Sequence, residues 1–250
     1  MIDFHSHIIP GIDDGSKDIN MSIKMLCESY KMGVNTVVAT PHCYIREQGD
    51  IQNFLKRRQE GIKKLIEAVE NSNMPLPKIK IGAEVRLFDD IADIESLRPL
   101  CIENSDYILV EMPYGKWDEN CYDFLYRLII KGMRPVMAHI ERFYAHEKEF
   151  YNLEALNLTY QVNAESLTLP EMKKPIENLF KRGMIQFLGS DMHNTTTRTS
   201  NMDEAKEVIK KKYGYDCYNY IMGNGYMALE NRPIENIRFK KRGIIDIFKK

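Results

Sequence analysis

The chain has 250 residues, with 35 basic and 36 acidic side chains, a formal net charge of −1 and 44% hydrophobic residues. These values are ordinary for a soluble globular protein, so they exclude collagen-like, disordered and membrane-spanning classes. The near-neutral charge also gives no electrostatic basis for bulk nucleic-acid binding, and we expect no nucleic-acid partner.

Short apolar runs alternate with helical periods along the chain. Strands are expected at 2–5, 36–40, 78–85, 107–111, 134–139, 159–163 and 185–189, and helices at 18–32, 51–70, 118–131, 170–182 and 202–212. This alternation favours a parallel sheet with helices outside it. Seven or eight units in about 240 residues favour a closed barrel over an open sheet, and no glycine-rich phosphate loop follows any strand.

We therefore expect a single α/β barrel domain over residues 1–250, with a short basic tail from about 231 to 250. Residues 230–250 hold seven basic and three acidic side chains. Such a segment is either a solvated tail or a docking patch for an anionic surface.

The start of the chain and its cysteines indicate the cytoplasm. Asp3, His5 and His7 stand where a signal peptide would carry its apolar run, and no apolar stretch approaches the roughly 18–20 residues that cross a bilayer. The five cysteines are scattered and odd in number, which argues against a disulfide framework and for a reducing compartment.

Histidines and carboxylates gather at the ends of the expected strands. The residues in question are His5, His7, His42, Glu84, Glu111, His139, Asp191 and His193, and Asp14 adds a further carboxylate. In a barrel the carboxyl ends of the strands share one mouth, so these side chains can converge there. Buried without partners they would cost several kcal/mol, a cost that divalent cations remove. Eight or nine donors suit two or three ions, and mixed nitrogen and oxygen ligands suit manganese, zinc or iron.

Several segments resemble the polymerase-and-histidinol-phosphatase (PHP) superfamily. They are HSHIIPGIDDGS at the start, TPH at 40–42, GAE at 82–84, AHIER at 138–142 and GSDMH at 189–193. More narrowly, the DDGS, EMPYG and AHIERF segments resemble the manganese-dependent bacterial protein-tyrosine phosphatases of capsule and exopolysaccharide loci, the CpsB/CapC type. The resemblance covers residues 1 to about 230 and implies a distorted seven-unit (β/α) barrel with three metals at its carboxyl-end face.

The resemblance also implies a ligand set and a metal. The ligands form three groups, of which the first two share Glu84: His5, His7, Glu84 and Asp191; Glu84, Glu111 and His139; and Asp14, His42 and His193. Asp13 is the alternative to Asp14 in the third group. Manganese is the expected ion, with zinc or iron as alternatives.

The expected reaction is in-line attack on the phosphorus of phosphotyrosine by a hydroxide that bridges two metals. Arginine forks match phosphate geometry, so Arg142 and Arg198 are the candidates for gripping the phosphoryl group, with Arg46 as a third. Tyr114 and Trp117 either line a slot for the aromatic ring or serve packing. For a partner, the resemblance implies a membrane-associated bacterial tyrosine autokinase of polysaccharide export; the oligomeric state is not indicated.

Four alternatives use other chemistry or other substrates. A PHP-type enzyme can instead hydrolyse a small metabolite such as histidinol phosphate, or act as a nuclease-like phosphodiesterase. Two further hypotheses assign the chain to other functional classes: a regulatory metal-binding module without turnover, and a metal-dependent amidohydrolase. Cys121 and Arg127 match the spacing of cysteine-based phosphatases, but they lie in a helical run whose amides already bond to carbonyls, so we interpret the match as coincidence.

Overall fold

The computed structural model describes residues 1–45, 48–86, 94–115, 117–156 and 158–240. Within these ranges the strands are β1 (Ile2–Ser6), β2 (Thr36–Ala39), β3 (His42–Tyr44), β4 (Lys78–Ile81), β5 (Glu84–Arg86), β6 (Tyr107–Glu111), β7 (Arg134–Met137), β8 (Thr159–Asn163) and β9 (Phe187–Gly189). The helices are α1 (Ile19–Lys31), α2 (Gln48–Asn71), α3 (Glu119–Ile130), α4 (Phe150–Ala155), α5 (Lys173–Arg182), α6 (Met202–Lys212) and α7 (Tyr215–Leu229), with 3₁₀ turns η1 (Ile94–Leu100), η2 (Ile140–His146) and η3 (Glu165–Leu167).

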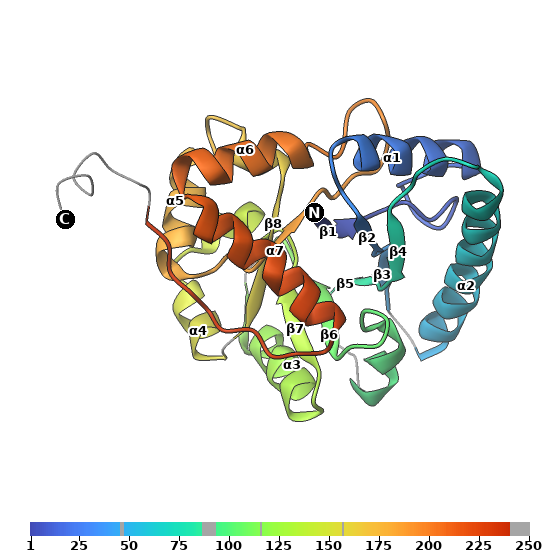
Figure 1. Ribbon diagram of the computed structural model, residues 1–250. Helices are drawn as coiled ribbons and strands as arrows, with labels where there is room; N and C mark the ends of the chain where they lie inside the picture. Colours follow the sequence, from blue (N-terminus) through green and yellow to red (C-terminus); the bar gives the residue numbers. More distant parts are fainter. Residues whose placement is uncertain (46–47, 87–93, 116, 157, 241–250) are drawn as a thin grey trace.

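The strands form a closed ring of parallel neighbours. One sheet has the order β1-β2-β4 and the other the order β3-β5-β6-β7-β8-β9. The segment after β9 returns to β1, because Asp191 N donates to His5 O (2.8 Å) and His7 N donates to Met192 O (3.0 Å). Helices surround this ring, which lies at the centre of the molecule (Figure 1).

One expected strand is broken into two, and another is followed by a strand that was not expected. The run 78–85 is divided into β4 and β5 at Gly82, and the unexpected strand β3 follows β2 after Pro41. Proline has no N–H to donate to a ladder, so the pairing is interrupted there. The neighbouring chain bends with it: Gly82 N donates to Ala39 O and Glu84 N to Pro41 O. The sequence-based prediction of one continuous strand over 78–85 was therefore wrong.

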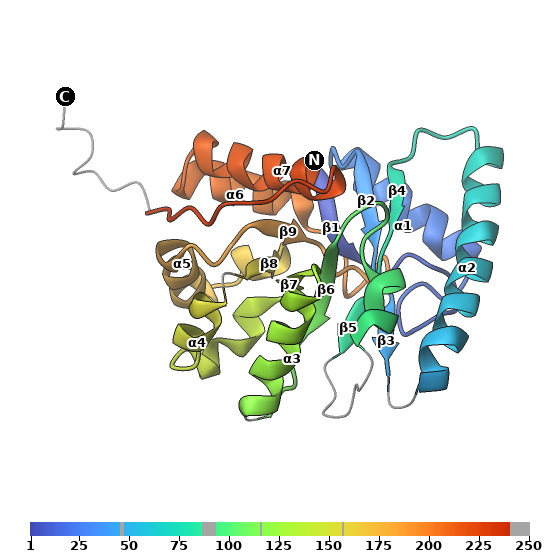
Figure 2. The ribbon, with the colours of Figure 1, turned by 90° about the horizontal axis from the view of Figure 1, so that it is seen from below.

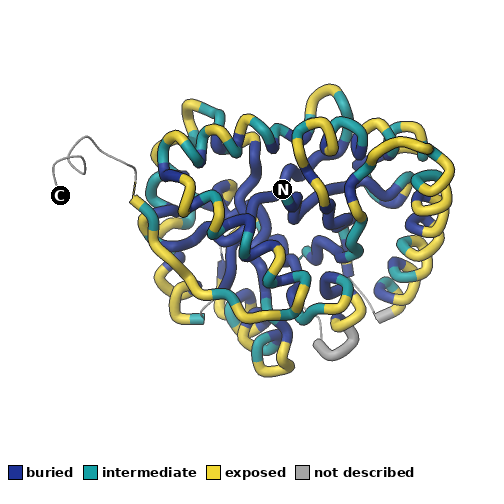
Figure 3. The backbone as a smooth tube through the Cα atoms, viewed as in Figure 1, coloured by how far each residue is buried: buried dark blue, intermediate teal, exposed yellow. Residues whose placement is uncertain are grey.

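The inside of the ring is a small apolar core. It joins side chains from strands on different sides of the ring, including Phe4, Val38, Leu109 and Val136, with Phe187, whose ring stacks on Phe4 at a centroid distance of 3.9 Å. A larger core lies between the ring and the helices. The buried inner tube and the exposed outer faces of the helices are distinct in Figure 3.

Helix α7 was not predicted from the sequence, because Gly223 and Gly225 interrupt its pattern. It lies across the end of the ring near the N-terminus (Figure 2). A Cβ at Gly225 would lie 3.1 Å from Ile2 Cδ1, so glycine permits the helix to approach the first strand. The other expected helices are present, although α5 begins three residues later than expected.

The last described residues are attached to the domain rather than free. Phe239 N donates to Phe180 O (3.0 Å), and Tyr220 Oη donates to Glu235 O (2.6 Å). Lys241, Arg242, Lys249 and Lys250 of the expected basic tail lie outside the described residues. In the described part of the chain, no helix has the length and apolar character needed to cross a membrane.

Candidate metal centre

All nine predicted ligand residues lie at the mouth where the strands end. They come from β1, β3, β5 and β6 and from the segments that follow β1, β7 and β9: His5, His7, Asp14, His42, Glu84, Glu111, His139, Asp191 and His193. Seven of them are buried; His42 is 12% exposed and Asp14 is 64% exposed at the side chain. The mouth therefore concentrates ionisable groups in a place with little water.

Glu84 is the centre of the cluster. Its Oε2 lies 2.8 Å from His42 Nδ1, 3.2 Å from His5 Nε2 and 3.4 Å from His7 Nε2. Its Oε1 lies 2.8 Å from His139 Nε2. Burial opposes ionisation of this carboxyl, but the charge of His5 and the hydrogen bond from His139 to Oε1 hold the pKa of Glu84 well below its usual value.

The donor atoms fall into three groups close enough to share an ion. The groups are His5, His7 and Glu84; His42, Glu84 and Glu111; and His7, Asp14, His42 and His193. His42 belongs to two groups, whereas the family resemblance places it in the third alone. His139 joins through Glu84 and through Glu111, whose Oε1 lies 3.6 Å from His139 Nε2.

The spacing of these atoms fits cation binding better than hydrogen bonding. His5 Nε2 and His7 Nε2 face each other at 3.1 Å. Two ligands held about 2.1 Å from one ion at right angles lie about 3.0 Å apart. Among the described residues, buried atoms without a hydrogen-bond partner include Glu84 Oε2, Glu111 Oε2, His42 Nδ1 and His193 Nε2. Lone pairs that converge without donors between them are the donor set that a divalent cation requires.

Asp13 and Asp14 have different places in the site. Asp14 Oδ1 lies 3.4 Å from both His42 Nε2 and His193 Nε2, as a ligand would. Asp13 Oδ2 instead accepts from His7 Nδ1 (2.7 Å) and from His42 N (3.0 Å). Burial of Asp13 is outweighed by the hydrogen bond from His7, and its pKa falls to about 2. Asp13 therefore orients His7, whose Nε2 is left to face Glu84.

The glycine of the DDGS segment makes this arrangement possible. A Cβ at Gly15 would lie 2.4 Å from both the Cβ and the carbonyl oxygen of His7. Only a residue without a side chain lets the loop fold back over His7, so that Ser16 N can donate to His7 O (2.9 Å).

The two arginines predicted to grip phosphate lie at the same mouth. Arg142 Nη2 lies 2.5 Å and Arg198 Nη2 lies 2.9 Å from Asp191 Oδ2. About a third of each side chain is exposed, 34% for Arg142 and 35% for Arg198. Each guanidinium has five N–H donors, so donors beyond those on Asp191 remain for a ligand. Arg46, the third candidate, lies outside the described residues.

Sequence reasoning missed a further arginine at this rim. Arg86 Nη1 lies 3.6 Å from Glu111 Oε2, and its guanidinium lies 5.3 Å from the centre of the Tyr114 ring. Tyr114 is exposed, and its Oη donates to Glu111 Oε1 (3.2 Å). The available indication was spacing, because Arg86 lies two residues after Glu84 on one strand and such residues share a face.

Trp117 does not line a slot. Its side chain is buried and stacks on His146 at a centroid distance of 5.0 Å, so the packing alternative holds for it. Cys121 is buried in the first turn of α3 and its amide bonds to Asp118 Oδ1. The following residues to Arg127 continue the same helix, so their amides cannot cradle phosphate. A cysteine-based phosphatase mechanism at Cys121 is thereby excluded.

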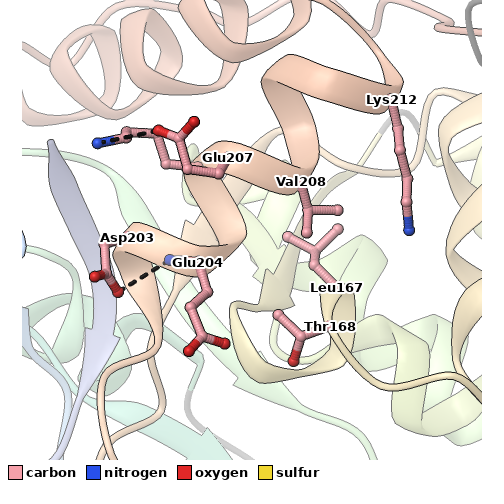
Figure 4. A pocket seen from close by; sticks show the side chains of 8 residues that line it. Leu167, Thr168, Asp203, Glu204, Glu207, Val208 and Lys212 are labelled. Carbon is pink, nitrogen blue, oxygen red and sulfur yellow. Dashed lines mark hydrogen bonds and ion pairs between the residues drawn. The ribbon is translucent and has the colours of Figure 1, made fainter.

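The structure has one hollow beside the cluster and another away from it. One of about 400 Å³ adjoins it and is lined by residues that include Asp14, His42, Tyr44 and Phe54. Another of about 590 Å³ lies between η3 and α6 (Figure 4), where Leu167 and Thr168 face side chains of α6 such as Glu204, Val208 and Lys212. None of the nine predicted ligands lines this second hollow.

Comparison with known proteins decides the family. The family model described as capsular polysaccharide synthesis, CpsB/CapC, matches residues 1–229. The chain belongs to the CpsB/CapC family. A similar protein is the tyrosine-protein phosphatase CpsB of Streptococcus pneumoniae. It is 31% identical over 226 residues, which cover 86% of this chain and 91% of the relative.

Solved structures agree with this assignment. A crystal structure from work on YwqE of Bacillus subtilis and CpsB of Streptococcus pneumoniae, described as unique metal-dependent tyrosine phosphatases, matches with a TM-score of 0.81 at 28% identity. The match covers 97% of this chain and 100% of that one. A histidinol phosphate phosphatase from Lactococcus lactis, crystallised with zinc, L-histidinol and phosphate, shares the fold with a TM-score of 0.52 at 15% identity, over 84% and 92% of the two chains. The predicted family and the predicted α/β barrel of the PHP type are confirmed.

Proposed function

We propose that this CpsB/CapC-family chain, a metal-dependent tyrosine-protein phosphatase, binds two or three divalent cations through nine side chains and hydrolyses phosphotyrosine on a protein. The proposed ligands are His5, His7, Asp14, His42, Glu84, Glu111, His139, Asp191 and His193. The observation that carries the proposal is the convergence of four histidines on the buried carboxylate of Glu84. Manganese is the proposed ion, with zinc or iron as alternatives.

The chemistry of the reaction is divided between the ions and the chain. When bound, divalent cations lower the pKa of water and neutralise the non-bridging oxygens of a phosphoryl group. The chain's own part is to place Arg142 and Arg198 beside that group, where their planar forks match its oxygens. A tyrosine leaving group has a pKa of about 10, so its departure needs little acid assistance from a side chain.

The aromatic part of the substrate has a suitable surface at the same rim. Tyr114 is exposed and lies near Arg142. Partial burial of its hydroxyl and the charge of Glu111 raise the pKa of Tyr114, and Arg142 offsets only part of this rise. Tyr44 is exposed and lies with its ring centre 5.3 Å from that of His42. We propose that the phosphotyrosine ring rests against Tyr114 or Tyr44 while its phosphate reaches the ions.

The proposed protein substrate is a membrane-associated bacterial tyrosine kinase of polysaccharide export. Support comes from the family description, capsular polysaccharide synthesis, and from relatives named as tyrosine-protein phosphatases. A purified kinase of this kind, phosphorylated on tyrosine, should lose its phosphate when the phosphatase is added.

The test compares substrates and ions in one assay. The chain is stripped with a chelator, desalted, and supplied with manganese, zinc or iron(II), and phosphate release is measured from a phosphotyrosine peptide, a phosphoserine peptide and histidinol phosphate. We expect no release from the stripped chain, and the fastest release from the phosphotyrosine peptide with manganese. Preference for histidinol phosphate, or full activity after stripping, would contradict the proposal.

A matched pair of variants tests the role of Glu84. Glu84→Gln keeps the size of the side chain but removes the charge shared by two donor groups, so activity should fall by more than about 100-fold, beyond the usual effect of losing an outer partner of a ligand. Glu103→Gln makes the same change at a partly exposed carboxylate that lies 3.7 Å from Lys80 Nζ, and it should leave activity unchanged. Equal activity of the two variants would refute the assignment of Glu84.

A further inference from the structure

Two neutral side chains of β8 connect ligand residues that lie far apart in the chain. Gln161 is completely buried and Asn163 is 5% exposed. Both point toward the mouth of the barrel, where Gln161 contacts His5 and Asn163 contacts Asp191. Neither side chain titrates, and neither carries a feature in the sequence that marks it as functional.

The two amides form one directed chain of hydrogen bonds. Gln161 Oε1 accepts from His139 N (2.8 Å) and from His5 Nδ1 (3.0 Å). Gln161 Nε2 donates to Asn163 Oδ1 (2.9 Å), and Asn163 Nδ2 donates to Asp191 Oδ2 (2.9 Å). This hydrogen-bond relay through Gln161 and Asn163 therefore connects one proposed ligand, His5, with another, Asp191.

The direction of this chain is fixed by groups whose roles are unambiguous. A backbone N–H only donates, so the Gln161 atom that faces His139 N must be the oxygen. A carboxylate only accepts, so the Asn163 atom that faces Asp191 must be the nitrogen. His5 Nδ1 must then carry the proton, because it faces the oxygen of Gln161.

In the neutral imidazole that binds a cation, a proton on Nδ1 leaves Nε2 of His5 with the lone pair. His5 Nε2 faces Glu84 Oε2 (3.2 Å), on the side where an ion would bind. At the other end, Asp191 Oδ2 is occupied by Asn163 and both arginines, whereas Oδ1 faces His7 Nε2 at 3.4 Å. The relay thus turns His5 Nε2 and Asp191 Oδ1 toward each other, at 3.6 Å.

We propose that Gln161 and Asn163 are positioning residues that set the tautomer of His5 and the orientation of Asp191 for a divalent cation; this inference rests on the proposed function. A neutral amide suits the task because it both accepts and donates, and because the mouth already holds several carboxylates. Gly189 provides the room: a Cβ there would lie 2.5 Å from His5 Cβ and 2.7 Å from Gln161 Nε2. An outer partner of this kind contributes about 10–100-fold in metal affinity.

The test uses a second buried glutamine as its control. Gln186 is also completely buried, and its Oε1 also accepts from a backbone amide, Tyr160 N (2.9 Å), but it precedes β9 at the opposite end of the ring. At similar volume, Gln161→Met removes three buried side-chain hydrogen bonds and Gln186→Met removes two, those with Tyr160 N and Gly183 O. Each is measured for its metal-free Tm and for its manganese affinity by competition with a fluorescent chelator.

We expect both variants to lower the metal-free Tm, and only Gln161→Met to weaken manganese binding, by about 10–100-fold. Asn163→Ala removes one of the three donors to Asp191 Oδ2 but leaves the bond between Gln161 and His5. It should weaken binding by about tenfold, and it decides the question if Gln161→Met does not fold. Wild-type manganese affinity in Asn163→Ala and Gln161→Met, or equal weakening in Gln186→Met, would overturn the relay. A wild-type chain that binds no manganese would instead overturn the proposed function.

Discussion

Asp13 and Asp14 are adjacent carboxylates that should respond in opposite ways to the same change. Asp13 Oδ2 accepts from His7 Nδ1 and His42 N, while Asp13 Oδ1 accepts from Gly15 N (3.0 Å). Asparagine cannot accept at both ends, so Asp13→Asn loses hydrogen bonds to a charged group worth about 1.5–3 kcal/mol of unfolding free energy in the metal-free protein. For a chain of this size the expected fall in Tm is about 3–12 °C.

Asp14 makes no such contribution to the metal-free fold. Its side chain is 64% exposed, and it lies 3.4 Å from His42 and His193 and 3.7 Å from Arg198. Asp14→Asn should therefore change the free energy of unfolding by less than about 0.5 kcal/mol. Its effect should appear only when metal is added, because a proposed ligand has been lost.

The assay combines thermal unfolding of the metal-free variants with manganese titration and metal analysis. Asp13→Asn should keep its full complement of ions at saturating manganese but bind them about 10–100-fold more weakly. Asp14→Asn should hold one ion fewer per chain at its unchanged metal-free Tm. If Asp13→Asn loses an ion and Asp14→Asn does not, the two roles have been assigned in reverse and the reasoning from the hydrogen bonds of Asp13 is refuted.

Three further outcomes follow from the same geometry. Manganese at 100 times its Kd should stabilise the stripped chain by about 2.7 kcal/mol, or about 5–11 °C in Tm, and the absence of a shift in scanning fluorimetry would contradict cation binding to the fold. Cys121→Ser should retain near wild-type activity, and iodoacetamide at pH 7.5 should not inactivate the enzyme, because the Cys121 thiol is buried in α3; inactivation would revive the cysteine mechanism. Arg142→Ala should lower kcat/KM by about 10²–10³-fold, and Arg142→Lys by less, since lysine keeps the charge but not the fork; equal losses would show that the charge alone matters.

The convergence of the nine proposed ligands could be predicted from the sequence because most of these residues are marked locally. Histidines and carboxylates at the ends of buried apolar runs, as at His42, Glu111 and His139, combine a strand with a chemically unusual side chain. The barrel topology then brings these side chains together, since parallel strands have their carboxyl ends at one mouth. No long-range information is needed beyond the alternation of strands and helices.

The supporting residues could not be predicted in this way. Gln161, Asn163 and Arg86 are ordinary residues of short strands, and their roles depend on partners 22 or more positions away, such as His139 for Gln161, Asp191 for Asn163 and Glu111 for Arg86. The break of the third unit at Gly82 was missed for a similar reason, because it follows from the bend of a neighbouring strand at a proline rather than from its own residues.

The arrangement around Asp191 connects the two arginines proposed to bind phosphate with the proposed metal ligands. Arg142 and Arg198 both donate to Asp191 Oδ2, and both keep about a third of their side chain exposed at the mouth. Two guanidinium groups on one oxygen orient the carboxylate so that its second oxygen, Oδ1, faces His5 and His7. A phosphoryl group that recruits the remaining N–H donors would bind to arginines that are already held in place, so little side-chain entropy is lost on binding. The same contacts make each arginine a support for Asp191, and its removal should weaken manganese binding as well as phosphate recognition.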